Sequence, residues 1–208
     1  MRRVSRRCVD YTGADLAEHV RETLRQKITG TAGPYNAVFT QNGIASTTAS
    51  VIAASLGYDD LDAIGPSEVE RIKSAHLLLS MYNAWQPGVF ALSGWDRVGA
   101  LPLKRSQVES LIATGDTRWI ERGAYDLMGW SPEATTSSSG MPLARALYGS
   151  LPEQLADSKS FVSRLSAILK VRKRHGFFSG SLLDVPEVPT KEMLVLVNRL
   201  FVGAIQIT

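Results

Sequence analysis

The stretch MYNAWQPGVFALSGWDRVGALPL, residues 81–103, decides the predicted fold. Its residues 89–92, VFAL, are apolar without alternation, which is typical of a strand covered on both faces in a parallel sheet. Trp95 and Asp96 follow at once, in a polar and aromatic cluster that spans residues 93–97. Enzymes with α/β folds place substrate-contacting groups after the carboxyl ends of such strands. The stretch therefore predicts an α/β unit with a candidate site behind its strand.

The composition limits the classes of protein that fit. The chain has 208 residues, 44% of them hydrophobic, which is enough to bury one large core. The net charge of +3 lacks the clustered basic stripe of a nucleic-acid binder, although residues 1–7, MRRVSRR, leave an arginine-armed nucleic-acid binder as a minor alternative. The single cysteine, Cys8, forms no internal disulfide, and no segment has the pattern of a signal peptide or a bilayer span. We expect a cytoplasmic protein with neither nucleic acid nor membrane as its partner.

Helical periodicity and capping signals predict five helices around this stretch. Residues 15–28 form an amphipathic helix, 44–56 a helix buried on nearly all sides, and 104–113 a short helix. A capping box of Ser67 and Glu70 starts a helix that runs to about residue 85 and holds His76 as a hydrogen-bonded core residue. Asp157 is the expected N-cap of the last helix, whose basic run 170–175 complements the helix dipole before Gly176.

Extended segments surround the helices. Residues 35–39 read as extended before a turn at 41–43, and residues 131–140, SPEATTSSSG, read as a polar loop. The segments 181–185, 193–197 and 204–208 are short, and prolines and a glycine separate them, which predicts an antiparallel β domain from residue 179. We accordingly expect two domains, 1–178 and 179–208.

A second candidate site lies in TRWIERGAYDLMGW, residues 117–130. Here Trp119, Tyr125 and Trp130 alternate with charged residues such as Arg118, without a convincing period. Aromatic faces beside charged hydrogen-bonding groups suit a carbohydrate, which has apolar C–H faces and hydroxyl edges. A loop that its aromatic residues anchor to the core explains the same pattern, and the sequence leaves both readings open.

Four long segments resemble one enzyme family. They are residues 35–64 (YNAVFTQNGIASTTASVIAASLGYDDLDAI), 71–103 (RIKSAHLLLSMYNAWQPGVFALSGWDRVGALPL), 115–127 (GDTRWIERGAYDL) and 148–176 (YGSLPEQLADSKSFVSRLSAILKVRKRHG). They are similar to the carboxyl-terminal part of α-amylase-superfamily enzymes of the trehalose synthase type, the maltose α-D-glucosyltransferases. The resemblance implies the last helices and the eighth strand of a (β/α)8 TIM barrel, with residues 89–92 as that strand, followed by the start of a β-sandwich domain.

The resemblance also implies a function and its limit. Such enzymes are retaining, with a nucleophile and an acid carboxylate about 5 Å apart. In the family these carboxylates follow earlier barrel strands, so we assign no catalytic residue, metal or cofactor here and expect a fragment that is inactive and poorly soluble without the amino-terminal barrel half. Its substrates would be small α-glucosides, maltose and trehalose. An α-glucan hydrolase fragment and a noncatalytic carbohydrate-binding module remain alternatives. The candidate substrate-binding residues are Trp95, Asp96, Arg118, Trp119 and Tyr125.

Overall fold

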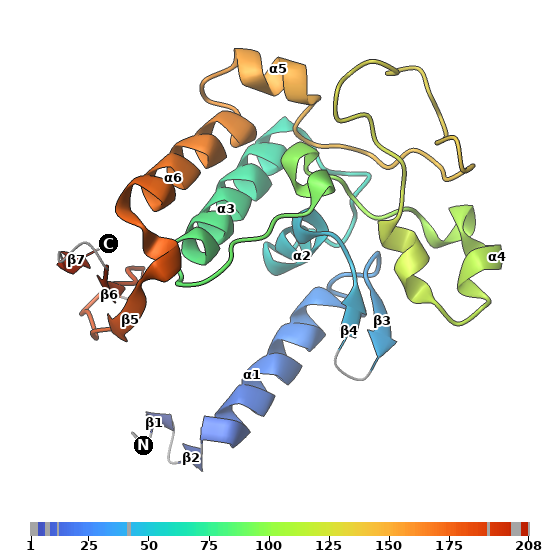
Figure 1. The fold of residues 1–208 in the computed structure, drawn as a ribbon. Coiled ribbons are helices and arrows are strands. Elements are labelled where there is room, and N and C mark those ends of the chain that lie inside the picture. Colours follow the sequence, from blue (N-terminus) through green and yellow to red (C-terminus); the bar gives the residue numbers. More distant parts are fainter. Residues whose placement is uncertain are drawn as a thin grey trace. The chain divides into compact units, whose positions relative to one another are not determined.

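A computed structural model describes residues 4–6, 9–11, 13–40, 43–190, 192–200 and 205–207. The chain divides into two compact units. The first consists of Met1–Ile72, Gly99–Tyr125 and Glu133–Leu147, and the second of Lys73–Val98, Asp126–Pro132 and Tyr148–Thr208. Figure 1 labels the elements of both units.

The first unit combines helices with two small antiparallel pairs of strands. These are β1 (Val4–Arg6) with β2 (Val9–Tyr11), and β3 (Ala37–Thr40) with β4 (Gly43–Ala45). The helices are α1 (Gly13–Ile28), α2 (Thr48–Ser55), the first turns of α3 (Pro66–Ala84) and α4 (Glu109–Ile112). Two 3₁₀ turns, Arg105–Gln107 and Thr117–Glu121, flank α4. A buried cluster holds this unit together and comprises Ala37, Ala45, Leu103, Val108, Ile120 and Ala144.

Several boundaries in this unit differ from the predicted ones. The periodic helix at 15–28 is confirmed as α1. The predicted buried helix 44–56 begins later, at Thr48, because Thr47 caps it, and residues 44 and 45 belong to β4. The capping box at Ser67 and Glu70 is wrong: α3 starts at Pro66, and Glu68 accepts a hydrogen bond from the Gly65 amide at 3.1 Å. The short helix 104–113 is split into a 3₁₀ turn and α4. The predicted turn at residues 41 and 42 lies outside the described residues.

The second unit packs helices against an extended segment. It contains the remainder of α3, the 3₁₀ turn Gly94–Val98, α5 (Leu151–Ala156), α6 (Phe161–His175) and the 3₁₀ turn Phe177–Ser179. Leu77 of α3 meets Phe161 and Leu165 of α6 in a buried cluster, so the two helices lie side by side (Figure 1). A three-stranded antiparallel sheet follows, in the order β5 (Ser181–Asp184), β6 (Val197–Arg199) and β7 (Ile205–Ile207).

The ends of α6 and the tail are close to prediction. Gly176 takes the left-handed conformation, with φ of 64°, directly after the basic last turn. The N-cap is Ser160, whose hydroxyl accepts from the Ser163 amide, whereas the predicted cap Asp157 lies at the end of α5. An antiparallel tail is confirmed, with the middle strand beginning at Val197, the last residue of the predicted segment 193–197.

The structure contains no strand at residues 89–92, where the sequence predicts one. Among the described residues, no strand of its unit pairs with this segment, so it forms no ladder. Its coverage also differs from the prediction of two buried faces. Phe90 and Leu92 pack against the cluster between α3 and α6, whereas Val89 is 97% exposed and Ala91 is exposed. We call residues 89–92 the open segment.

Candidate functional site

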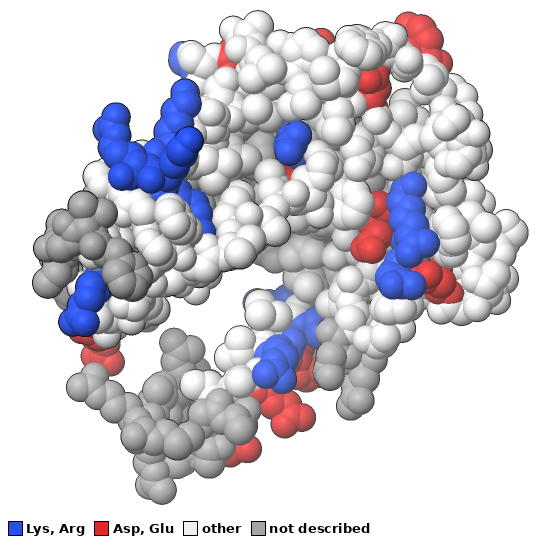
Figure 2. Space-filling view, viewed as in Figure 1, with Lys and Arg blue, Asp and Glu red and all other residues white. Residues whose placement is uncertain are grey.

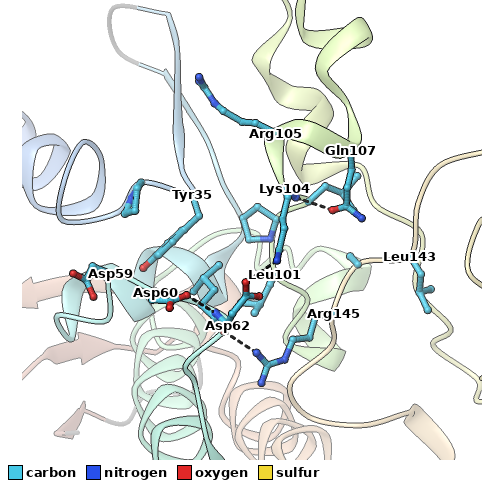
Figure 3. Close-up of a pocket in the computed structure, with 15 residues that line it drawn as sticks. Tyr35, Asp59, Asp60, Asp62, Leu101, Lys104, Arg105, Gln107, Leu143 and Arg145 are labelled. Atoms are coloured by element: carbon cyan, nitrogen blue, oxygen red, sulfur yellow. Dashed lines mark hydrogen bonds and ion pairs between the residues drawn. The ribbon is translucent and has the colours of Figure 1, made fainter.

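A cavity of about 460 Å³ in the first unit is a candidate binding site (Figure 3). Four segments form it: residues 34–35 before β3, residues 59–62 after α2, residues 101–107 before α4, and residues 143–145. Leu101 and Leu103 are buried and contribute apolar lining, because their segment is held by main-chain hydrogen bonds from Leu101 to Arg145 (2.8 Å) and from Leu103 to Ile120 (2.7 Å). The cavity therefore combines a fixed apolar lining with a rim of polar side chains.

Polar contacts between the loops shape the rim. Lys104 Nζ lies 2.6 Å from Asp62 Oδ2, and the Lys104 amide donates to Gln107 Oε1 at 2.9 Å. Arg145 donates to the carbonyls of Leu61 (2.7 Å) and Ile64 (2.8 Å), so it holds the loop with the three aspartates, residues 59–62, in place. The contacts of Lys104 with Asp62 and of Arg145 with Leu61 and Ile64 join segments more than 40 residues apart in sequence, and Figure 3 shows these side chains at one cavity.

The ionisation of two rim groups follows from their surroundings. Burial, together with the nearby Asp59 charge, raises the pKa of Tyr35 to about 12, so its hydroxyl stays protonated and donates to the Tyr58 carbonyl at 2.6 Å. The hydrogen bond that Lys104 donates to Asp62 raises the pKa of Lys104. At neutral pH the lining carries three carboxylates, Asp59, Asp60 and Asp62, opposite three cations, Lys104, Arg105 and Arg145.

Three of the predicted substrate-binding residues lie in the first unit. Arg118 donates to both oxygens of Asp116, at 2.9 and 2.8 Å, and its guanidinium sits 4.3 Å from the centre of the Phe39 ring. The guanidinium of Arg122 lies 4.7 Å from the centre of the Trp119 ring, which also packs on the buried cluster. Tyr125 is half-buried at the end of this segment. The surroundings of Arg118 and Trp119 agree with the reading in which the aromatic residues anchor a loop.

Trp95 and Asp96, the other two predicted residues, lie in the second unit, in the 3₁₀ turn Gly94–Val98. Trp95 is half-buried. Asp96 is 6% exposed, accepts from the Ser93 amide at 3.2 Å, and lies 4.0 Å from His76 Nε2. The five predicted residues are thus divided between the two units, with three in the first and two in the second.

The prediction of a hydrogen-bonded core histidine is confirmed. His76 is 1% exposed, its Nδ1 lies 3.1 Å from the Tyr148 hydroxyl, and its ring centre is 4.6 Å from that of Phe161. Burial lowers the pKa of His76 to about 4, so the imidazole is neutral at pH 7. His19, predicted at the surface, is exposed on α1.

Sequence reasoning missed the cavity of the first unit and a buried arginine of the second. The acidic turn at residues 58–62 reads as a solvated loop, and nothing in the sequence pairs it with Lys104 or Arg145. Arg172 lies within the basic run that the helix dipole explains, yet it is buried on α6. One signal was available for it, because Arg172 follows Leu165 by seven residues and so continues the apolar face of the helix.

The described residues lack two features, a metal-binding cluster and a membrane-spanning helix. They contain no group of three or more His, Cys, Asp and Glu side chains arranged to hold a metal ion. None of the helices in the same residues is both long and apolar enough to cross a bilayer. In comparisons with known proteins, no family model, no curated protein and no solved structure matches the chain.

Proposed function

We propose that this chain is the carboxyl-terminal part of a retaining α-glucosyl transferase that interconverts maltose and trehalose. The proposal starts from the four segments that resemble the trehalose synthase type, which follow one another in the family's order. It assigns residues 89–92 to the eighth barrel strand and α6 to the last barrel helix. The nucleophile and the acid of a retaining mechanism would come from the earlier barrel strands.

The observation that carries the proposal is the one-sided cover of the open segment. Phe90 and Leu92 alternate with Val89 and Ala91, so the first pair faces the α3–α6 cluster and the second pair faces away from it. All four side chains are apolar, and a strand with two apolar faces is typical of a sheet that is covered on both sides. The helices of this unit supply the cover of one face, and a barrel interior would supply the other.

The main chain of the open segment supports the same assignment. Among the described residues, no hydrogen bond within the second unit reaches the amides or carbonyls of residues 89–92. A barrel strand pairs along both of its edges, so two rows of donors and acceptors are available for neighbouring strands. An isolated strand with such edges is prone to association, which is the physical basis of the expected poor solubility.

Coexpression with the amino-terminal barrel half of a trehalose synthase-type enzyme tests the proposal. We expect trehalose to form from maltose only when both parts are present. Val89→Asp should abolish this activity by placing a charge in the barrel interior, whereas Leu155→Asp, a matched change at a 68% exposed site on α5, should preserve it. Copurification of the two parts without activity, or full activity of Val89→Asp, would contradict the proposal.

The same assay separates the nearest alternative. An α-glucan hydrolase would release glucose from maltooligosaccharides in the coexpressed complex and form no trehalose. A noncatalytic module would bind sugar, and the complex with the barrel half would form neither trehalose nor glucose. Product analysis of one reaction by chromatography therefore separates the two activities from each other and from a module without activity.

A further inference from the structure

The cavity of the first unit takes no part in the function proposed above. We propose that it is a binding site for a neutral saccharide of one or two rings. The inference goes beyond the proposed function, since the site is built from the first unit alone and needs no barrel. It rests on three features of the cavity: its apolar base with a polar rim, the hydrogen-bonding groups of the rim that its own contacts do not use, and the balance of charges in its lining.

The cavity is amphipathic in the way that a sugar is. Leu101 and Leu103 are each 3% exposed and, with Ala144 at 7%, present an apolar surface at its base. Asp59, Asp60 and other polar side chains stand around this base and are exposed. A pyranose ring offers an apolar C–H face to such a base and hydroxyl groups to such a rim. The volume of about 460 Å³ lies within the range of small-molecule sites, roughly 300–1,000 Å³.

The rim keeps hydrogen-bonding groups that its own contacts do not use. Among the described residues, no hydrogen bond reaches the Asp59 carboxylate, and Asp60 uses only Oδ1, which accepts from the Asp62 amide at 2.8 Å. Gln107 uses its side-chain carbonyl for the Lys104 amide, which leaves its NH₂ group as a donor. A ligand therefore meets both acceptors and donors. Vicinal hydroxyls, which donate and accept at once, match that mixture.

The charge of the lining favours a neutral ligand over an ionic one. Asp59, Asp60 and Asp62 balance the three cations of the same cavity, and Lys104 and Asp62 neutralise each other directly at 2.6 Å. A phosphate that binds the cations would be repelled by the neighbouring carboxylates. An amine that binds the carboxylates would be repelled by the neighbouring cations. Like-charge contacts of this kind weaken binding of either ion.

Titration of the full chain with maltose, trehalose and glucose, followed by calorimetry and by NMR of the leucine methyl groups, tests the site. We expect saturable binding of at least one sugar with shifts at Leu101, Leu103 and Leu143. Asp59→Asn should weaken this binding about tenfold, because it replaces a charged acceptor by a neutral one. Glu109→Gln, the same kind of change at an exposed residue of α4 outside the lining, should leave it unchanged.

Ionic relatives of the sugar provide the control on ligand class. Glucose 6-phosphate and glucosamine should bind no more tightly than glucose. Tighter binding of either one, an unchanged affinity in Asp59→Asn, or no saturable binding of any sugar overturns the inference. These titrations use the chain alone, so their failure is separate from failure of the coexpression assay, which measures turnover of the joined parts.

Discussion

Arg172 provides the sharpest test of how the second unit is held together. The residue is 7% exposed on α6, and its guanidinium donates to the carbonyls of Ala84, Gln86 and Gly88, the second at 2.8 Å. The last carbonyls of a helix have no partner within the helix, and Ala84 is the last residue of α3. Arg172 therefore caps α3 from a neighbouring helix and fixes the turn that leads into the open segment.

We predict that Arg172→Met lowers the free energy of unfolding by about 3 kcal/mol. A hydrogen bond to a charged group contributes roughly 1.5–3 kcal/mol, and Arg172 makes three of them, but such contributions are not additive. The loss is largest at Ala84, which is fully buried, because water cannot replace the guanidinium there. Gly88 is exposed, so its carbonyl regains a partner from solvent. The methionine retains most of the apolar stem of the side chain.

Urea unfolding followed by far-UV circular dichroism measures this difference. Lys173→Met is the matched control, since the neighbouring side chain is exposed, carries the same charge and should change stability by no more than about 0.5 kcal/mol. With a slope of about 2 kcal/mol per M urea, Arg172→Met should lower the midpoint by about 1.5 M. Equal midpoints for the two variants would refute the reasoning, and faster amide exchange near Gly88 in Arg172→Met alone would support it.

Three further changes test other parts of the fold. His76 has a pKa of about 4 in the folded chain and about 6.5 in the unfolded chain, so the unfolded chain binds a proton first as the pH falls. The free energy of unfolding should therefore decrease by about 3 kcal/mol between pH 6.5 and pH 4. In urea melts, His76→Gln should remove this dependence on pH. Gly176→Ala should lower the free energy of unfolding by about 1 kcal/mol, because Gly176 has a φ of 64°. Ala167→Gly, at an exposed position of α6, should lower it by a similar amount through helix propensity alone. A melting temperature of Gly176→Ala equal to that of the wild type would contradict the role of Gly176 as the C-cap. Thr47→Ala should cost about 1 kcal/mol by removing the acceptor of the Ser50 amide, and rescue by Thr47→Ser is expected in the same measurement.

Local patterns predicted the long helices well because their signals are local. The four-residue spacing of Leu16, Val20, Leu24 and Ile28 defines α1, and the basic last turn before Gly176 defines the end of α6. Cap positions were harder. Glu68 rather than Glu70 reaches back to the start of α3, since Pro66 fits the first helical position and moves the cap to Gly65.

Features that depend on distant segments were beyond sequence reasoning. The cavity of the first unit needs Asp62 beside Lys104 and Arg145 beneath Leu61, and these pairs are 42 and 84 residues apart. The strand at residues 89–92 was predicted from hydrophobicity, which reports burial but not whether a partner strand is present to form a ladder. The same apolar run therefore yields an extended segment without pairing.

The open segment is nevertheless held in place at both of its ends. Before it, Gly88 donates to the Phe178 carbonyl at 3.0 Å and accepts from Arg172; after it, the Ser93 amide donates to Asp96 at 3.2 Å. The α3–α6 cluster fixes one face of residues 89–92, and within the described part of the chain no main-chain hydrogen bond reaches them. Because the open segment is already ordered, pairing with another strand costs little further conformational entropy in the segment itself. This arrangement explains why an exposed Val89 is compatible with a defined conformation, and why we propose a barrel interior as its cover.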